Sequence, residues 1–251
     1  MKFGYPLRQC VEALLPICDE VVLAYDPTTE DGTRELARQL RDELGIVLYE
    51  SIWDMSNMDR GFEIGHQSQV AVDACSPDTE WRLCVQQDEA FHEDDAGKIK
   101  ELVLNASNGG VDGFQFLRPY FFGNLHTIRR DWSVEIIRLT RKGAPLTYDG
   151  FDGQNCVPTA PCNIAKGGVW MYHYSRIGDP AIIAKRVRNV DTFFHAEDNL
   201  PAESDLTPYD FTTKEYDSYA FTENPQETDS ALVNYQGTHP LPYAELYQDY
   251  E

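Results

Sequence analysis

Acidic residues follow a short apolar run near position 85. The run from Trp81 to Val85 is typical of a buried strand, and the sequence Gln-Gln-Asp-Glu at positions 86–89 comes directly after it. The carboxyl ends of strands in an open α/β sheet form a ligand crevice, where carboxylates can bind a divalent cation. A solvated turn is the alternative, because acidic residues are common at strand ends. Asp88 and Glu89 are therefore candidate metal ligands.

Further acidic residues at positions 93–95 have a different explanation. Asp94 or Asp95 is expected to cap a helix that runs to about Ala106, since apolar residues follow at helical spacing. A hydrolase site made of Asp88, Glu89 and His92 is a further alternative. It is the weaker one because these three residues do not have a familiar ligand spacing.

The elements that would position these residues alternate in the first half of the chain. An apolar strand from Val21 to Tyr25 precedes a polar loop, a helix from about Thr33 to Leu44 and a strand from Ile46 to Tyr49. This order predicts a βαβ unit. A helix over about Gly65 to Cys75 then leads to the strand at Trp81, and the alternation predicts a largely parallel sheet.

The second half of the chain has a different pattern. Apolar strands are expected at 114–117, 134–139 and 169–174, with long loops between them, and a helix is expected from Pro180 to about Phe194. This half is predicted to contain antiparallel pairing. Residues 200–251 contain eleven acidic residues and one basic residue, Lys214. They predict an irregular acidic extension that packs on the domain, with complete disorder as the alternative.

The composition excludes several classes of protein. The net charge of −21 argues against nucleic acid as a partner, because phosphate binding needs Lys and Arg. No apolar run approaches the roughly 18 residues of a membrane span, so no transmembrane segment is predicted. The sequence does not open like a signal peptide, and the six cysteines lack zinc or disulfide spacing. A cytoplasmic protein with reduced thiols is expected.

Several motifs together resemble a known family. The segments 19–23, 26–33 and 86–89, followed by Tyr172-His173-Tyr174, are similar to glycosyltransferase family 2, and the resemblance extends from about Lys2 to His195. It implies the GT-A fold, a Rossmann-type mixed, mainly parallel sheet flanked by helices. It also implies transfer of a sugar from a nucleotide-sugar to a saccharide or lipid-linked acceptor with inversion. Residues 1–199 would form this domain, with a nucleotide half to about 110 and an acceptor half from about 111.

The resemblance implies a cation site for Mn²⁺ or Mg²⁺. Asp88 matches the last metal-binding acid of the family, Glu89 is a secondary ligand, and His173 matches a late histidine that completes the site. A half-buried histidine without a ligand role is the alternative for His173. Gln86 stands where the family has an acid, and an amide is a weaker cation ligand than a carboxylate.

The resemblance also implies donor contacts. Asp26 matches an acid that contacts the nucleoside, with Thr28 beside it, and Arg60 matches a basic residue near the donor phosphates. Gln86 is assigned to the same donor site. The alternatives are an Asx turn at Asp26 and a solvated arginine at position 60.

Inverting transfer needs a carboxylate that accepts the proton of the acceptor hydroxyl. Asp131, Glu135, Asp149 and Asp152 all lie in the acceptor half, and spacing does not select among them. Asp131 is our candidate because it stands beside Trp132, whose ring could stack on a sugar. A plain loop acid is the alternative.

The first strand of the family fold has no counterpart in the resemblance. Family members have this strand ahead of the segment that aligns with Lys2 to Pro6, and without it a neighbouring strand has unpaired backbone groups and exposed apolar surface. A homodimer could then form. Together with Gln86, this departure gives a second hypothesis, a binding or scaffold protein on a transferase fold that has lost its activity.

Overall fold

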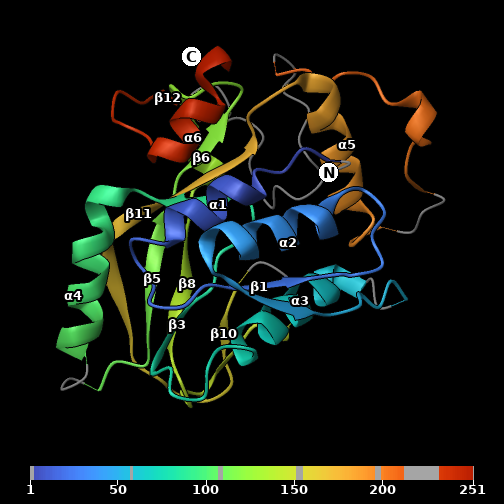
Figure 1. The fold of residues 1–251 in the computed structure, drawn as a ribbon. Helices are drawn as coiled ribbons and strands as arrows, with labels where there is room; N and C mark the ends of the chain where they lie inside the picture. The colour runs from blue at the N-terminus through green and yellow to red at the C-terminus, as the bar shows by residue number, and fades with distance from the viewer. Residues whose placement is uncertain are drawn as a thin grey trace.

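The computed structural model describes residues 3–56, 59–106, 110–150, 155–195, 199–211 and 232–250. Two separate β-sheets with their covering helices make up most of the molecule, and a two-stranded ribbon lies at one end (Figure 1). The first sheet contains β1 and β2, and the second contains eight strands.

The first sheet belongs to the predicted βαβ unit. Strand β1 (Val22–Tyr25) leads through α2 (Thr33–Leu44) to β2 (Val47–Glu50), which pairs with β1 in parallel. Ala37 and Leu40 of α2 are fully buried against this unit. Asp31 accepts a hydrogen bond from the Thr33 amide at 3.0 Å and so supports the start of α2. Gly45 ends the helix in the left-handed region, at φ 72°.

The second sheet is mixed. Its strand order is β12-β7-β6-β11-β5-β8-β3, and β4 pairs with β11 outside this path. The strands are β3 (Trp81–Leu83), β4 (Glu89–Phe91), β5 (Gly113–Arg118), β6 (Tyr120–Phe122), β7 (Thr127–Arg129), β8 (Val134–Arg141), β11 (Ile164–Arg176) and β12 (Leu232–Asn234). The α/β class with a mixed sheet is as predicted. Strand β3 pairs antiparallel with β8, and β11 pairs in parallel with β5 and β6. The ribbon contains β9 (Leu146–Thr147) and β10 (Val157–Pro158).

The long strand β11 organises the second sheet. It pairs with β5 up to Trp170, and beyond that point it lies between β4 and β6. Its register shifts between Lys166 and Trp170, where Gly168 has φ 72°. At Gly167 a side chain would collide with the Phe116 ring. The two glycines therefore permit the bulge that lets one strand serve two sets of partners.

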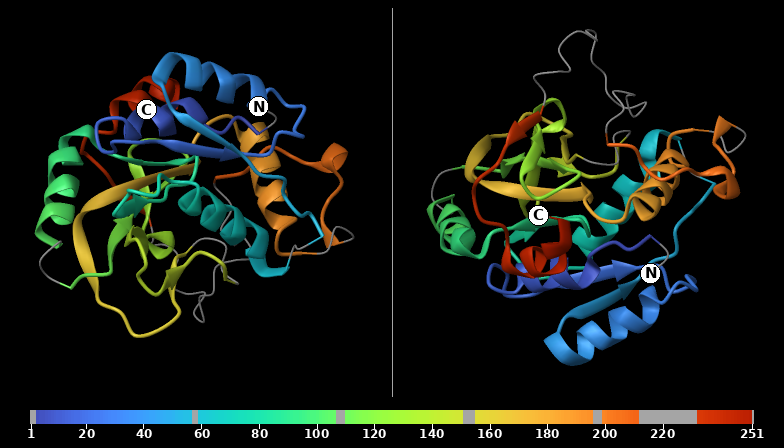
Figure 2. Two further views of the ribbon diagram at one scale, coloured as in Figure 1. Left: turned by 60° about the horizontal axis from the view of Figure 1, so that its bottom comes forward. Right: turned by 90° about the horizontal axis from the view of Figure 1, so that it is seen from above.

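Helices cover the two sheets, as the views in Figure 2 show. They are α1 (Leu7–Leu14), α3 (Phe62–Asp73), α4 (Ala96–Ala106) and α5 (Pro180–Asp191), with 3-10 turns at Asp59–Gly61, Glu93–Asp95, Arg130–Trp132, Glu203–Asp205 and Gln248–Tyr250. Asp179 caps α5 through the Ala181 amide. The turn at Glu93–Asp95 precedes α4. The His92 ring accepts a hydrogen bond from the backbone N–H of Asp94 in this turn.

The last part of the chain packs against the rest of the molecule. Strand β12 extends the large sheet at β7, and α6 (Leu241–Leu246) lies against α1. Tyr243 and Tyr247 are buried in a cluster with Phe121 and Tyr174. Residues 232–250 of the acidic extension are therefore part of the fold.

Two further expectations concern the whole chain. All six cysteines are free thiols, and Cys10, Cys84 and Cys156 are buried. Among the residues that the structure describes, no helix is both long enough and apolar enough to cross a bilayer.

Candidate functional site

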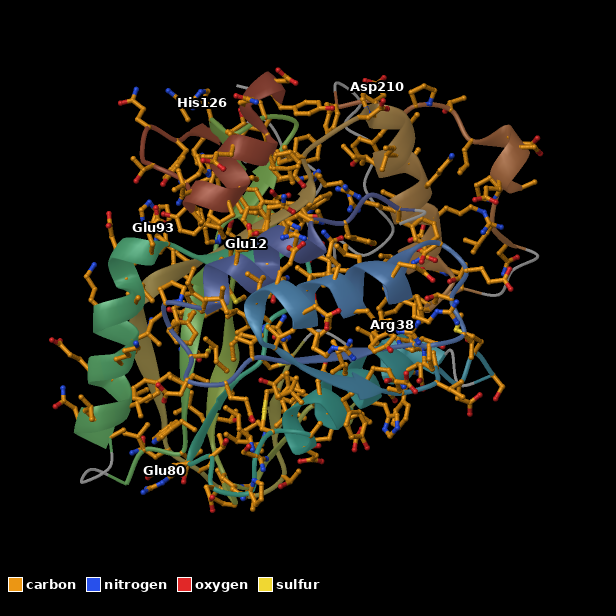
Figure 3. The ribbon with its side chains drawn as sticks, viewed as in Figure 1. Glu12, Arg38, Glu80, Glu93, His126 and Asp210 are labelled. Carbon is orange, nitrogen blue, oxygen red and sulfur yellow. The ribbon has the colours of Figure 1, made fainter. Side chains whose placement is uncertain are left out.

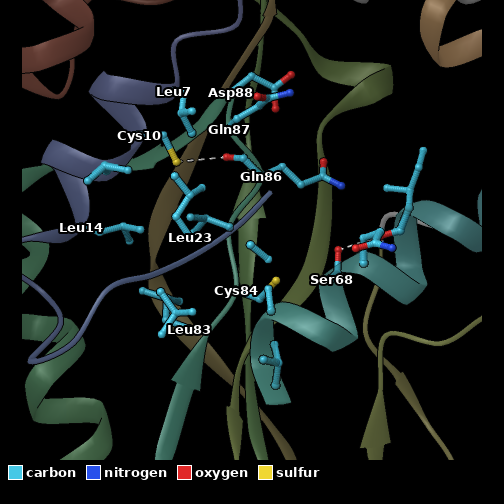
Figure 4. Close-up of a pocket in the computed structure, with 18 of the residues that line it drawn as sticks. Leu7, Cys10, Leu14, Leu23, Ser68, Leu83, Cys84, Gln86, Gln87 and Asp88 are labelled. Atoms are coloured by element: carbon cyan, nitrogen blue, oxygen red, sulfur yellow. Dashed lines mark hydrogen bonds between the residues drawn. The ribbon is translucent and has the colours of Figure 1, made fainter. Parts of the chain in front are cut away.

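One large cleft contains most of the predicted site residues. It has a volume of about 2230 Å³ and lies between β1 and β3, with α1 and α3 beside it (Figure 4). Beyond the carboxyl end of β3 it reaches buried polar groups of β5, β6 and β11. We call this region the polar end, defined by Asp88, Arg118, Trp132, His173 and Arg176.

Asp88 and His173 lie together at the polar end. Asp88 follows β3, and its carbonyl accepts the Tyr174 amide of β11 at 2.9 Å. His173 lies between β4 and β6, where its neighbours in the two strands are Glu89 and Tyr120. The distance between His173 Nε2 and Asp88 Oδ2 is 3.6 Å, and both residues are 7% exposed. The structure thus brings together two groups that are 85 residues apart in the sequence.

The surroundings set the protonation of this pair. Burial raises the pKa of Asp88, but His173, Arg186 and Arg118 outweigh burial and bring that pKa below its ordinary value. Burial lowers the pKa of His173, against the opposing effect of the Asp88 carboxylate. At neutral pH the pair is therefore a carboxylate and a neutral imidazole, which are the forms that bind cations.

Glu89 has other partners. It is fully buried, and its Oε1 accepts hydrogen bonds from Arg118 at 3.1 Å and Arg138 at 2.8 Å. Its Oε2 accepts a hydrogen bond from the backbone N–H of Gln86 at 2.8 Å. These arginines outweigh the effect of burial and lower the pKa of Glu89. The carboxylate thus fixes the 86–89 turn that carries Asp88, and its predicted role as a secondary ligand stays a prediction.

The 86–89 turn is also held from the opposite side. The Cys10 thiol of α1 donates to the Gln86 carbonyl at 3.3 Å. The Tyr243 hydroxyl of α6 lies 3.2 Å from the Glu89 carbonyl and 3.4 Å from that of Gln87. Helices from both ends of the chain therefore position the turn.

Two buried arginines are functional candidates that the sequence reasoning missed. Arg118 and Arg176 border the polar end and are 5% and 8% exposed. In contrast, the acidic side chains of Glu80, Glu93 and Asp210 lie on the outside of the molecule (Figure 3). Arg118 is the last residue of β5, and Arg176 is the last residue of β11. A basic residue directly after an apolar run was the sequence signal that could have identified each of them. Guanidinium groups in such a position can bind phosphate or carboxylate.

Asp26 and Thr28 form a local turn at the mouth of the cleft. Asp26 Oδ1 accepts hydrogen bonds from the Thr28 amide at 2.7 Å and the Thr28 hydroxyl at 2.6 Å. Its Oδ2 accepts the Trp53 amide at 3.1 Å. The Asx turn is therefore present, and Asp26 also borders the cleft. Thr28 is exposed and orients the Asp26 carboxylate.

Arg60 and Gln86 also border the cleft. Arg60 is exposed and has φ 51°. In the described part of the chain it is the one non-glycine residue with a positive φ. Such backbone strain is often associated with functional sites. The backbone of Gln86 is held by Cys10 and Glu89, and its side chain is partly buried. The donor roles of both residues remain predictions.

Asp131 differs from Glu135 and Asp149 because it borders the cleft. Its carboxylate pairs with Arg129 at 3.1 Å. The Arg129 guanidinium lies 3.6 Å from the centre of the Trp132 ring, and Tyr120 packs edge-on against that ring. Glu135 instead pairs with Lys166, Asp149 pairs with His66, and Asp152 lies outside the described residues.

The metal-ligating side chains are few. In the ranges that the structure describes, no group of three or more His, Cys, Asp and Glu residues is arranged to bind a metal ion. Asp88 and His173 could supply two ligands to a metal ion. Oxygen atoms of a substrate would have to supply the others. The hydrolase set is not assembled, because His92 is buried elsewhere and its ring contacts Thr238 and the Asp94 amide.

Comparisons of the chain with models of protein families, with curated proteins and with solved structures found no match. The similarity to glycosyltransferase family 2 consequently depends on the sequence motifs alone. Any function has to be argued from the site itself.

Proposed function

We propose that this protein transfers a sugar from a nucleotide-sugar donor to a saccharide or lipid-linked acceptor, with inversion and with the help of Mn²⁺ or Mg²⁺. The observation that carries the proposal is the polar end. There a carboxylate and a neutral imidazole lie beside two buried arginines, although the protein has a net charge of −21. A diphosphate with its cation is a ligand that needs both kinds of group.

The donor would lie along the cleft from its mouth to the polar end. Asp26, oriented by Thr28 and the Trp53 amide, would accept hydrogen bonds from the nucleoside. Arg60 and Gln86 border the same path, and Arg118 and Arg176 would bind phosphate oxygens. These positive charges stabilise the negative charge that develops on a diphosphate leaving group.

The Asp88 and His173 pair fits a divalent cation in part. Two ligands about 2.0–2.2 Å from one cation lie roughly 3–4 Å apart, and the observed separation is 3.6 Å. His173 Nδ1 is buried and makes no hydrogen bond within the described residues, so nothing in them fixes its tautomer. When bound, the cation would supply charge neutralisation at the departing diphosphate. Mg²⁺ and Mn²⁺ accept phosphate oxygens as ligands, which compensates for the small number of protein ligands.

The acceptor would approach from Trp132. Arg129 lies over this ring and Arg176 lies 5.9 Å from its centre, so a stacking sugar would have to displace one of these guanidinium groups or share the ring with it. Asp131 would accept the proton of the acceptor hydroxyl. Arg129 holds this carboxylate in an ion pair, so Arg129 would have to release it when the acceptor binds.

Thermal unfolding with ligands tests this proposal. Nucleoside diphosphates that differ in base, each with Mn²⁺, should raise the melting temperature for at least one base, because a ligand of the folded state stabilises it. The Asp88→Asn variant should lose this shift. Asp42→Asn, which changes an exposed carboxylate of α2, is the matched control and should keep it. The absence of any shift with the common bases would contradict the proposal.

A binding or scaffold protein without turnover is the second candidate. It is favoured by the small number of metal-ligating side chains among the described residues and by Gln86 in place of an acid. It predicts no cation affinity and no release of nucleoside diphosphate from any nucleotide-sugar. Saturable Mn²⁺ binding that Asp88→Asn abolishes would exclude it.

A further inference from the structure

A buried glutamine of α3 borders the cleft near its mouth. Gln67 is 7% exposed, and it lines the cleft together with Asp26 and Trp53. A glutamine amide carries a donor nitrogen and an acceptor oxygen. The atom that the protein leaves unoccupied therefore decides what Gln67 can bind.

Two acceptors fix the orientation of this amide. Gln67 Nε2 donates to Glu63 Oε1 at 2.7 Å, and it lies 3.4 Å from the Ile52 carbonyl oxygen. A reversed amide would place its oxygen against a carboxylate and a carbonyl, which is unfavourable. Gln67 Oε1 accepts no hydrogen bond from the residues that the structure describes. The side chain thus offers a fixed acceptor for a ligand.

Glu63 is itself held firmly in place. It is 1% exposed, and its Oε1 also accepts a hydrogen bond from the backbone N–H of Asp54 at 3.0 Å. Hydrogen bonds to a carboxylate are stronger than those between neutral groups. Glu63 is therefore a positioning residue for the Gln67 amide.

Asp26 is a second acceptor, and one peptide unit connects it to Gln67. The N–H of Trp53 donates to Asp26 Oδ2 at 3.1 Å, and the C=O of the same peptide unit is the Ile52 carbonyl that faces Gln67 Nε2. The Trp53 ring also borders the cleft, and it packs edge-on against Phe193 with 5.5 Å between the ring centres. Bases stack well on such rings. A planar ligand on Trp53 would meet two acceptors.

The four common bases differ in the groups that they would present to two acceptors. Guanine has two adjacent donors, N1–H and the 2-amino group. Uracil has one N–H between two carbonyls, and in adenine and cytosine an acceptor nitrogen adjoins the amino group. An acceptor that faces another acceptor is repelled and remains unpaired. Two fixed acceptors therefore favour guanine.

We propose that Gln67 is a specificity-determining residue that, together with Asp26, selects guanine in the nucleotide-sugar donor. The donor would then be a sugar linked to guanosine diphosphate (GDP). This inference rests on the proposed function, which places the nucleoside at Asp26. It adds the identity of the base and a residue that reads it.

Calorimetric titrations of the unmodified protein with nucleoside diphosphates and Mn²⁺ test this selection. GDP should bind at least about tenfold more tightly than UDP, ADP or CDP, because a site built for hydrogen bonds rejects a ligand that lacks them. Inosine diphosphate keeps N1–H and lacks the 2-amino group. It should bind about fivefold more weakly than GDP, which corresponds to about 1 kcal/mol for one net hydrogen bond.

A variant of Gln67 assigns the selection to this residue. Gln67→Met removes the acceptor with little change in side-chain size, so the preference for GDP over UDP should fall by about fivefold. Gln39→Met is the matched control, because Gln39 of α2 is exposed and donates to Glu43, also four residues away, at 2.7 Å. The control should keep the preference of the unmodified protein.

The outcomes separate this inference from the proposed function. UDP, ADP or CDP that binds as tightly as GDP, or inosine diphosphate that matches GDP, would overturn the role of Gln67 and leave sugar transfer in place. Binding of none of these nucleotides would contradict the proposed function and this inference together. If Gln67→Met fails to fold, the comparison of GDP with inosine diphosphate on the unmodified protein decides.

Discussion

The two regions of the cleft differ in how their hydrogen-bonding groups are satisfied. At the polar end, side chains are held by several hydrogen-bonding partners, as Glu89 is by Gln86, Arg118 and Arg138. Between β1 and β3, no strand pairing is present within the described residues, and the side chains around this part of the cleft are mainly apolar. The side chains of the polar end are thus fixed by their partners, whereas the rest of the cleft is bordered by strands that pair on one side.

The largest expected effect concerns the network that organises the polar end. Glu89→Ala should lower the free energy of unfolding by about 3–5 kcal/mol, because it leaves the buried Arg118 and Arg138 without their carboxylate. Urea denaturation measures this change. Glu135→Ala is the control, since its partner Lys166 is exposed and the loss should be below about 1 kcal/mol. Equal losses in the two variants would show that the Glu89 network does not organise the region.

Two leucines near β1 compare a filled core with the lining of the cleft. Leu40 of α2 is fully buried, so Leu40→Ala should cost about 2–5 kcal/mol of unfolding free energy. Leu23 of β1 borders the cleft and is partly buried, so Leu23→Ala should cost about 1 kcal/mol. The same denaturation experiment tests both. A cost for Leu23→Ala as large as that for Leu40→Ala would mean that this part of the cleft is packed like a core.

A smaller effect should appear in the pH dependence of stability. The His239 ring lies 2.8 Å from the Tyr174 hydroxyl and 2.9 Å from the Leu125 carbonyl. Burial lowers its pKa to about 4. Between that value and the ordinary one of about 6.5, the unfolded chain binds a proton that the folded chain does not. Stability should therefore fall as the pH falls from about 6.5 to 4, by about 1–2 kcal/mol after allowance for the partly exposed ring.

The His239→Phe variant isolates this contribution. Its own stability can differ from that of the unmodified protein, so the slope of unfolding free energy against pH is the quantity to compare. A flatter slope between pH 4 and 6.5 is expected. An unchanged slope would show that His239 binds its proton equally in the folded and unfolded chains.

Local patterns predicted the elements better than their partners. The βαβ unit from β1 to β2 was predicted from the order of its apolar and polar segments, which is a local signal. Helix α1 was missed, although Leu7, Cys10, Val11 and Leu14 have helical spacing. The alternation of strands and helices predicted parallel neighbours for β3. Its antiparallel pairing with β8 depends on contacts almost 60 residues away, which a local pattern does not contain.

The positions of some site residues were also predicted, but the partners of others were not. The proximity of Asp88 and His173 was expected from the motifs, and Asp131 was placed beside Trp132 at the cleft. The partners of Glu89 were not foreseen, because nothing near positions 118 or 138 indicates that two arginines meet a buried carboxylate. The burial of His92 was not foreseen, because Thr238, which hydrogen-bonds its ring, lies 146 residues further along the chain.

The location of a bound cation tests the central claim most directly. Crystals grown with Mn²⁺ and a nucleoside diphosphate should show a single strong anomalous peak between Asp88 Oδ2 and His173, with phosphate oxygens completing its coordination and Arg118 or Arg176 near the diphosphate. Crystals of Asp88→Asn should lack the peak. A diphosphate bound at the polar end without Mn²⁺ near this pair, or Mn²⁺ bound elsewhere, would contradict the account.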